Sequence, residues 1–229
     1  MPLSNLKKVF RRFTRPAKWY NLRNLEPVSN IFGLERGTPV DRYYIDNFLN
    51  KNRQYIKGIT LEIADNSYSK KYGSDVLSYE ILHYNNENPD ATIIGDLSKP
   101  ETLPQNRIDC FICTQTLQFI YNFKDAIKGA SRLLKPGGII LATVPGISQV
   151  SKYDMERWGD YWRFTGLSAA KAFAEVFGKE MVEVTCYGNV LSTVAFLEGI
   201  SAEELTREEL DFKDENYPLL ITILARKAE

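Results

Sequence analysis

The 229-residue sequence lacks the features of membrane-spanning and strongly basic proteins. It has no run of about 18 apolar residues, and this excludes a transmembrane helix. Its 29 basic and 29 acidic residues give a formal net charge of zero, so electrostatics do not make the whole molecule a nucleic-acid binder. The opening residues MPLSNLKKVF lack the apolar core of a signal peptide, and we therefore expect a cytoplasmic protein.

Side chains that bind metals or form disulfides are scarce. There is one histidine, His83, and there are three cysteines, Cys110, Cys113 and Cys186. Cys110 and Cys113 have a C-x-x-C spacing, but they lie inside the apolar run 108–113. In a strand, residues three apart point to opposite faces. We therefore expect buried thiols rather than a disulfide or a shared metal, and we predict no metal site.

Acidic residues are absent from the start of the chain, because none precedes Glu26. Apolar side chains at near-helical spacing alternate there with basic ones. One interpretation is an arm that contacts an anionic surface, such as a membrane or a phosphate-bearing substrate. The other is a solvated leader that packs loosely on the domain. We divide the chain into a basic arm and loop, 1–40, and a folded domain, 41–229. The basic residues are Lys7, Lys8, Arg11, Arg12, Arg15, Lys18 and Arg23.

With 44% hydrophobic and 25% charged residues, the composition is that of an ordinary globular protein. Short apolar strands alternate with helical segments, which predicts βαβ units and a mostly parallel sheet of about seven strands with helices on both faces. No long regular helix separates the last two strands, so an antiparallel edge is expected there. We predict strands over 59–64, 76–79 (reaching toward 82), 91–94, 108–114, 139–144, 181–187 and 219–225, and helices from 41 to near 58, over 123–134 and over 168–177.

Ligands of such sheets bind at the carboxyl ends of the strands. A carboxylate at the end of the second strand can accept both ribose hydroxyls, and Glu80 follows Glu62 by 18 residues, close to the spacing of about 20 in dinucleotide folds. Asp96 can accept an adenine amine, Leu97 can cover the ring, and Gln115 can reach a charged tail. Each acid has the alternative of lying in an exposed loop. We predict cofactor contacts from Glu62, Ala64, Asp65, Asn66, Glu80, Asp96, Leu97 and Gln115.

Two segments resemble signatures of class I S-adenosylmethionine-dependent methyltransferases. The segment GDLSKPETLPQNRIDCFICTQTLQFI is similar to the signature of their third and fourth strands, and RLLKPGGIILATVPG to their later helix–turn–strand signature. The resemblance spans roughly 59–145. It implies a Rossmann-like fold, S-adenosylmethionine as cofactor, S-adenosylhomocysteine as product, and methyl transfer to an O or N atom. Two further segments, GTPVDRYYIDNFL and WGDYWRFT, resemble a subgroup linked with glycan and natural-product pathways.

The sequence departs from this family at the glycine-rich loop. The usual E-x-G-x-G is here E-I-A-D-N, with Ala64 and Asn66 at the glycine positions. Glycine lets the backbone approach the ligand and adopt positive φ. Alanine is small enough for that approach, and asparagine tolerates left-handed geometry. The departure leaves room for a catalytically silent relative.

The segment after Pro145 follows a strand end and is rich in aromatic and charged residues. Such side chains stack on a ring and orient its polar groups, although a packed lid is the alternative. The initial helix is placed to cap the cofactor, with Arg42 and Tyr43 near its carboxylate. Candidate general bases are Asp160, Asp154 and His83. Candidate substrate contacts are Arg157, Trp158, Tyr161, Trp162 and Arg163.

The sequence therefore favours a biosynthetic methyltransferase that acts on a small molecule or glycan. The first alternative is a catalytically silent cofactor-binding or scaffold protein. The altered loop at Ala64 and Asn66 suggests this alternative. The second, a nicotinamide-dependent reductase, is disfavoured because there is no G-x-G-x-x-G motif and no convincing Tyr-x-x-x-Lys set. The oligomeric state and the acceptor are left open.

Overall fold

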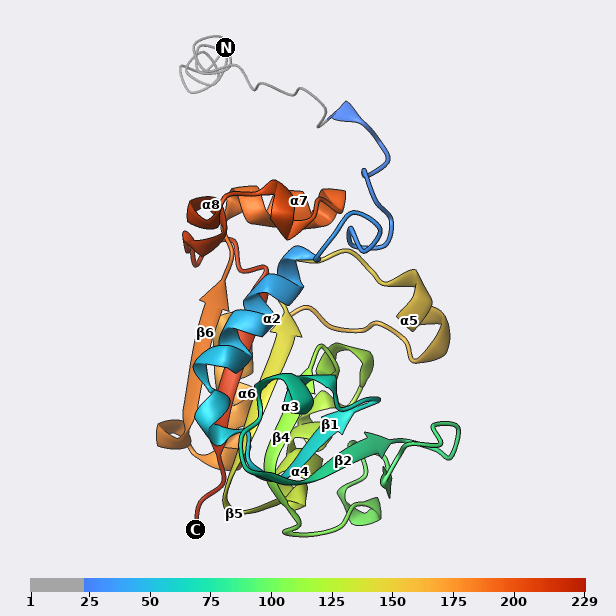
Figure 1. Cartoon of the computed structure of the whole chain (residues 1–229), viewed down its shortest axis with the longest axis vertical. Coiled ribbons are helices and arrows are strands. Elements are labelled where there is room, and N and C mark those ends of the chain that lie inside the picture. The colour runs from blue at the N-terminus through green and yellow to red at the C-terminus, as the bar shows by residue number, and fades with distance from the viewer. Residues whose placement is uncertain (1–22) are drawn as a thin grey trace, which may run out of the picture.

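Seven strands form one sheet in the computed structural model, which describes residues 23–229 (Figure 1). The strand order is β3-β2-β1-β4-β5-β7-β6. Strands β1 to β5 are parallel to one another, and β7 runs antiparallel between β5 and β6. The predicted mostly parallel α/β sheet is confirmed. The strands are β1 (Gly58–Ile63), β2 (Val76–His83), β3 (Ile93–Ile94), β4 (Ile108–Thr114), β5 (Leu134–Pro145), β6 (Val182–Tyr187) and β7 (Leu220–Arg226).

The strand order creates a binding crevice. The chain adds β2 and β3 on one side of β1 and then crosses over to add β4 and β5 on the other side. Loops that leave the carboxyl ends of β1 and β4 therefore diverge in opposite directions, and the space between them is where ligands bind in doubly wound sheets.

Helices cover both faces of the sheet (Figure 1). On one face, α2, α7 and α8 pack on β4, β5 and β7, and side chains of α3 join them. On the other face lie α4 and α6. Helix α5 covers neither face but belongs to the segment at the carboxyl edge. The helices are α2 (Val40–Lys51), α3 (Ser67–Tyr72), α4 (Phe123–Leu133), α5 (Lys152–Arg157), α6 (Gly166–Phe177), α7 (Val190–Glu198) and α8 (Arg207–Asp211).

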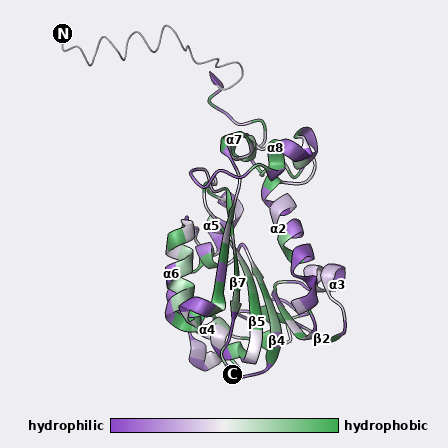
Figure 2. Cartoon of the chain, turned by 90° about the vertical axis from the view of Figure 1, so that its left-hand side faces the viewer, coloured by the Kyte–Doolittle hydropathy of each residue, from purple (hydrophilic) through white to green (hydrophobic). Residues whose placement is uncertain are grey.

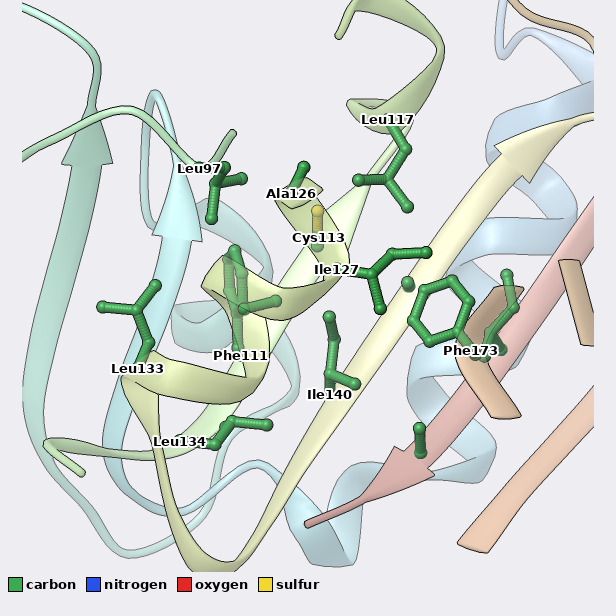
Figure 3. Close-up of a cluster of buried hydrophobic side chains, with 14 of the residues drawn as sticks. Leu97, Phe111, Cys113, Leu117, Ala126, Ile127, Leu133, Leu134, Ile140 and Phe173 are labelled. Atoms are coloured by element: carbon green, nitrogen blue, oxygen red, sulfur yellow. The ribbon is translucent and has the colours of Figure 1, made fainter. Parts of the chain in front are cut away.

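The alternation along β4 explains why there are two cores. Cys110 and Ile112 belong to the core under α2, whereas Phe111 and Cys113 belong to the core under α4 and α6. Figure 3 shows Phe111 and Cys113 beside Ile127 of α4. The prediction of buried thiols on opposite faces is thus confirmed for Cys110 and Cys113, and all three cysteines are free.

Several predicted boundaries differ from the structure. Strand β2 extends to His83 because its last residues pair with β3. Strand β5 begins at Leu134 and includes the K-P-G-G residues, since the Gly137 amide donates to the Lys227 carbonyl at 3.0 Å. Helix α6 begins at Gly166 behind a Thr165 cap, two residues before the predicted Ser168, whose hydroxyl completes the capping box.

Residues before α2 pack on the domain from Ser29 onward. The Ser29 amide donates to the Glu198 carbonyl, Arg36 pairs with Glu204, and Thr38 bonds to Glu203. The division of the chain near residue 40 stays a prediction, and most of the basic arm lies outside the described residues. Within residues 23–229, no helix is long and apolar enough to cross a bilayer.

Candidate functional site

A cavity of about 1090 Å³ opens at the carboxyl ends of β1 to β5. This volume is at the upper end of the range for small-molecule sites, so it accommodates a nucleoside cofactor together with part of an acceptor. Its walls come from the loops after the parallel strands, from the start of α2, and from the segment 148–163 that carries α5. We call this last segment the lid segment.

Glu62, near the end of β1, anchors the loop that follows. Its carboxylate accepts hydrogen bonds from the backbone amides of Tyr68 and Ser69, at 3.2 and 2.6 Å, and from the Ser69 hydroxyl at 2.5 Å. Burial raises the pKa of Glu62, and these hydrogen bonds only partly offset the effect. Glu62 therefore holds the start of α3 against β1 while it lines the cavity.

The backbone after β1 takes the left-handed turn that glycine usually makes, but it does so at Ala64. The φ of Ala64 is 69°, and that of Asn66 is −126°. The Asn88 side-chain amide holds the strained residue by donating to the Ala64 carbonyl at 2.8 Å. Asn66 does not use the left-handed geometry that asparagine tolerates, and it does not line the cavity, so its predicted cofactor contact is not supported. Ala64 and Asp65 line the cavity.

Glu80 does not lie where the sequence places it. Because β2 continues to His83, the residues that reach the cavity are His83 and Tyr84. The Glu80 carboxylate instead accepts from Arg107 at 3.0 Å and from Ser78 at 3.1 Å. Burial by itself raises the pKa of Glu80, but hydrogen bonds from Thr92, Arg107 and Ser78 lower it overall. The prediction that Glu80 faces a ribose is therefore corrected: it forms a structural ion pair.

Asp96 and Leu97 follow β3 and line the same cavity as the loop after β1. The Asp96 carboxylate accepts from the amide and hydroxyl of Ser98, at 2.9 and 2.7 Å, and pairs with Lys99 at 3.2 Å. Burial opposes ionisation, yet these partners together lower the pKa of Asp96. An ionised acceptor is thus fixed at this edge, above the buried Leu97.

Two glutamines after β4 form a coupled pair in the cavity wall. Gln115 has a φ of 46°, and its side-chain carbonyl accepts from the Gln118 amide at 3.1 Å. Gln118 is 4% exposed, and its Oε1 is the one buried side-chain oxygen or nitrogen among the described residues without a hydrogen-bond partner. This pairing leaves the amide nitrogen of Gln115, a donor, for a ligand.

Of the two α2 residues predicted for the cofactor site, only one lines the cavity. The Arg42 guanidinium donates to the Tyr68 hydroxyl at 2.6 Å at the cavity wall. Beside it, burial raises the pKa of Asp41, and the charge of Arg42 opposes this rise. Tyr43 points away and donates to Asp211 of α8 at 2.7 Å, so its predicted contact with a ligand carboxylate is corrected.

Charged groups hold the lid segment in shape. Arg163 donates to both oxygens of Asp160, at 2.5 and 2.9 Å, and also to the carbonyls of Ser148 and Gln149. The Asp160 carboxylate, 2% exposed, accepts in addition from the Ser151 amide at 3.0 Å. Asp154 accepts from the Ser151 hydroxyl at 2.5 Å at the start of α5. Asp160 is thus ion-paired with Arg163, whereas Asp154 forms no ion pair with any of residues 23–229.

Aromatic side chains attach the lid segment at both sides of the cavity. Trp158 packs edge-on against Tyr84, with ring centroids 4.9 Å apart, and lies near His83. Tyr161 packs edge-on against Tyr121 after β4, at 5.4 Å. Trp162 turns away from the cavity, and its indole donates to the Tyr121 carbonyl while its ring packs toward the core. Its predicted substrate contact is therefore corrected.

The cavity gathers most of the predicted site residues. Further lining residues were not predicted from the sequence, among them Phe32, Tyr68, the strand-end Tyr84, Gln118 and Tyr121. Only Tyr84 carried a signal, because it directly follows a strand. The predicted residues that line the cavity are Arg42, Glu62, Ala64, Asp65, His83, Asp96, Leu97, Gln115, Asp154, Arg157, Trp158, Asp160, Tyr161 and Arg163.

Comparison with known proteins supports the class that this geometry suggests. Residues 57–142 match a family model described as a methyltransferase domain. No match is found among curated protein sequences. Within residues 23–229, no cluster of three or more His, Cys, Asp or Glu side chains is arranged to hold a metal.

Several solved structures share this fold, and two of those described next are methyltransferases. A methyltransferase from Archaeoglobus fulgidus, described as S-adenosylmethionine-dependent, is 14% identical, has a TM-score of 0.51, and is matched over 81% of this chain and 94% of its own. Phosphoethanolamine N-methyltransferase 2 of Haemonchus contortus, in complex with S-adenosylmethionine, is 13% identical, with a TM-score of 0.53 and coverages of 82% and 53%. The cyclase SpnF is 15% identical, with a TM-score of 0.50 and both coverages at 84%.

The sheet order and the cavity at its carboxyl edge define an α/β domain of the class I methyltransferase type. Residues 57–142 match the methyltransferase-domain model, and the chain shares its fold with the solved methyltransferase structures.

Proposed function

We propose that this protein transfers a methyl group from S-adenosylmethionine to an O or N atom of a small molecule, with a sugar or a natural-product intermediate as the favoured acceptor. The observation that carries the proposal is the single cavity whose β1–β3 side offers hydrogen-bond acceptors and whose opposite wall is an aromatic lid segment. One site thus has room for a cofactor and an acceptor at the same time.

The polar groups on the cofactor side suit S-adenosylmethionine. Asp65 and Asp96 are acceptors for ribose hydroxyls and an adenine amine, and Leu97 offers an apolar surface for the ring. Arg42 and the free amide nitrogen of Gln115 are donors for the carboxylate of the methionine portion. The cofactor, when bound, supplies an electrophilic methyl group on a sulfonium.

The lid segment suits a ring-shaped acceptor that carries hydroxyl groups. Tyr121, Trp158 and Tyr161 offer stacking surfaces, and the Arg157 guanidinium lies 3.4 Å from the centroid of the Tyr153 ring. These side chains orient the acceptor, and holding the reacting atoms in line supplies much of the rate enhancement of such transfers.

For removal of the acceptor proton we propose Asp154 rather than Asp160 or His83. Both oxygens of the Asp160 carboxylate already accept hydrogen bonds from Arg163, and one of them also accepts from the Ser151 amide, so neither is open to an acceptor. The Nδ1 of His83 lies 3.0 Å from the Asn85 carbonyl, on the cofactor side. Asp154 lies in the lid segment and lines the cavity.

The first experiment is calorimetric titration with S-adenosylmethionine and S-adenosylhomocysteine. Asp96→Asn and Glu80→Gln are matched variants, because each replaces one acid in or after a neighbouring strand by its amide. Asp96→Asn removes a charged acceptor from the cavity, so we expect at least about tenfold weaker binding. Glu80→Gln alters an acid that faces Arg107, so we expect unchanged affinity once correct folding is verified. If neither ligand binds at millimolar concentration, the proposed methyltransferase activity is wrong, and the catalytically silent scaffold is the remaining interpretation.

The second experiment tests the base. With an acceptor in hand, Asp154→Asn is expected to lower kcat by about a hundredfold or more and to keep cofactor affinity. A variant that retains the wild-type kcat would contradict this role for Asp154.

A further inference from the structure

The cavity extends past the cofactor side into a region beside β5 and β7. Its floor includes Phe196 of α7 and Leu219, the residue directly before β7. Its outer wall is a turn before α2, from which Ile31, Phe32 and Leu34 line the cavity. Figure 2 shows α7 at the end of the molecule where the described chain begins. We call this region the apolar arm, because none of the five side chains is polar or charged.

The turn that forms the outer wall is held firmly in place. The buried Ser29 hydroxyl oxygen accepts from the amides of Ile31 and Gly33, at 3.2 and 3.0 Å. A Cβ added at Gly33 would lie only 2.7 Å from a backbone oxygen at the end of α7, so the turn packs directly on that helix. Phe32 has a φ of 61°, which is unusual for a bulky residue, and its ring lies 5.5 Å from that of Phe196. The turn is therefore a preformed wall, and strained conformations of this kind concentrate at ligand sites.

The lid segment bounds the apolar arm on its other side. The Gln149 side-chain amide donates to the Asn30 carbonyl at 3.3 Å, and both residues line the cavity. Figure 1 shows the chain before α2 beside the chain that leads into α5. One continuous cavity thus runs from the aromatic side chains of the lid segment into the arm. A ring that is held by the lid segment can therefore extend a substituent into the arm.

Aliphatic side chains in the arm stay exposed. Ile31 and Leu34 are 52% and 61% exposed although they line a concave site. An apolar ligand group that covers them gains free energy in proportion to the area that it buries. S-adenosylmethionine offers no such group, since the side chains that suit its ribose, adenine and carboxylate follow β1, β3 and β4 or belong to α2. We propose that the apolar arm binds an alkyl or acyl chain of the methyl acceptor.

The acceptor is then a ring-bearing molecule with a lipophilic chain, rather than a free sugar. This proposal rests on the proposed methyl transfer, because it assigns the chain to the acceptor of that reaction. A free sugar would leave Ile31 and Leu34 in water. A second copy of this chain would cover these two side chains at the rim, but it would leave the floor at Phe196 and Leu219 unfilled.

The test is calorimetric titration of the full chain with methyl, butyl and octyl β-glucosides below their micelle concentrations, with and without S-adenosylhomocysteine. Octyl glucoside is expected to bind at least about tenfold more tightly than butyl glucoside, because each fully buried methylene tightens binding by up to about fourfold. The double variant Ile31→Asn/Leu34→Asn should lose this gain. The matched control is Leu77→Asn/Leu167→Asn, which alters exposed leucines outside the cavity and should keep the gain.

Three outcomes would overturn the proposal. These are an affinity of the wild type that does not rise with chain length, a gain that Ile31→Asn/Leu34→Asn retains, and a wild-type dimer that this variant dissociates without any effect of chain length. Titration with S-adenosylhomocysteine alone separates the two proposals. A protein that binds octyl glucoside tightly but no cofactor would refute the methyl transfer and keep the arm as an apolar binding site. Cofactor binding without the chain-length effect would refute the arm alone.

Discussion

At the scale of single residues, the loop after β1 shows how an altered motif keeps its geometry. Ala64 occupies the left-handed region with φ 69°, and Asn88 stabilises it through the Ala64 carbonyl. For an L-residue this conformation costs roughly 1–2 kcal/mol. The backbone path of a glycine loop is thus retained at the cost of local strain, and strain of this kind concentrates at functional sites.

Ala64→Gly should therefore stabilise the fold. We expect a gain of up to about 1 kcal/mol in the free energy of unfolding, because relief of the left-handed strain exceeds the entropy that glycine costs. The matched control is Asn66→Gly, whose φ of −126° needs no glycine and which should destabilise. Urea unfolding measures both. If Asn66→Gly stabilised the protein and Ala64→Gly did not, the assignment of strain would be wrong.

Glu62, also a single residue, makes the free energy of unfolding depend on pH. Burial raises its folded-state pKa above the unfolded value, so the folded protein keeps this proton to higher pH. The stability linked to that proton is present below the unfolded pKa and is lost as pH rises through the folded pKa. In urea unfolding from about pH 4 to about pH 7, Glu62→Gln should gain stability relative to the wild type as pH rises. A pH-independent difference would contradict this prediction.

At the scale of elements, the lid segment keeps its shape through Arg163. This one side chain bonds to the Asp160 carboxylate and to three backbone carbonyls of the same segment, those of Ser148, Gln149 and Trp162. A planar guanidinium presents its donors in a fixed fork, which lysine cannot reproduce. Arg163 therefore links both ends of the segment, and the aromatic contacts of Trp158 and Tyr161 attach it to the cavity walls.

Arg163→Lys should loosen the lid segment. We expect faster limited proteolysis within 148–160 and a loss of about 2 kcal/mol of stability, below the cost of a fully buried pair because Arg163 is 27% exposed. Lys124→Ala, which breaks the exposed pair with Glu175, is the control and should cost less than about 1 kcal/mol. If Arg163→Lys and the wild type are cleaved at equal rates, Arg163 does not hold the lid segment in place.

At the scale of the whole molecule, one sheet separates two cores, and β4 contributes to both. The reactivity of Cys110 therefore measures how open the core on one face is, and that of Cys113 measures the same for the core on the other face. Burial raises the pKa of Cys113 to about 12 and raises that of Cys110 as well, so neither forms the reactive thiolate near neutral pH. Cys186 is half-buried.

Thiol reactivity should thus follow global unfolding. In native protein at neutral pH, a chromogenic disulfide reagent is expected to modify only Cys186, and slowly, because burial also raises the pKa of this thiol. In denaturant all three thiols should react. Cys186→Ser should leave the native protein inert to the reagent. Rapid native modification of Cys110 or Cys113 would show that one core opens locally.

Much of the fold and part of the candidate site could be predicted from sequence because local patterns control them. Asp96, Leu97 and Gln115 line the cavity, as expected for residues that directly follow parallel strands, wherever those strands lie in the sheet. Thr165 was missed as a cap although it stands one residue before α6, because Ser168 offered a similar signal three residues later.

The sequence by itself determined the α/β class, the apolar alternation of β4 and the strand-end positions that carry polar residues, since these depend on neighbours along the chain. Tertiary structure alone decided where side chains point. Assembly of the sheet brought Arg107, which precedes β4, to Glu80 within β2, and packing turned Tyr43 toward Asp211 and Trp162 toward Tyr121. These outcomes require contacts between residues far apart in the chain, and such contacts form only when the sheet and both helix layers assemble.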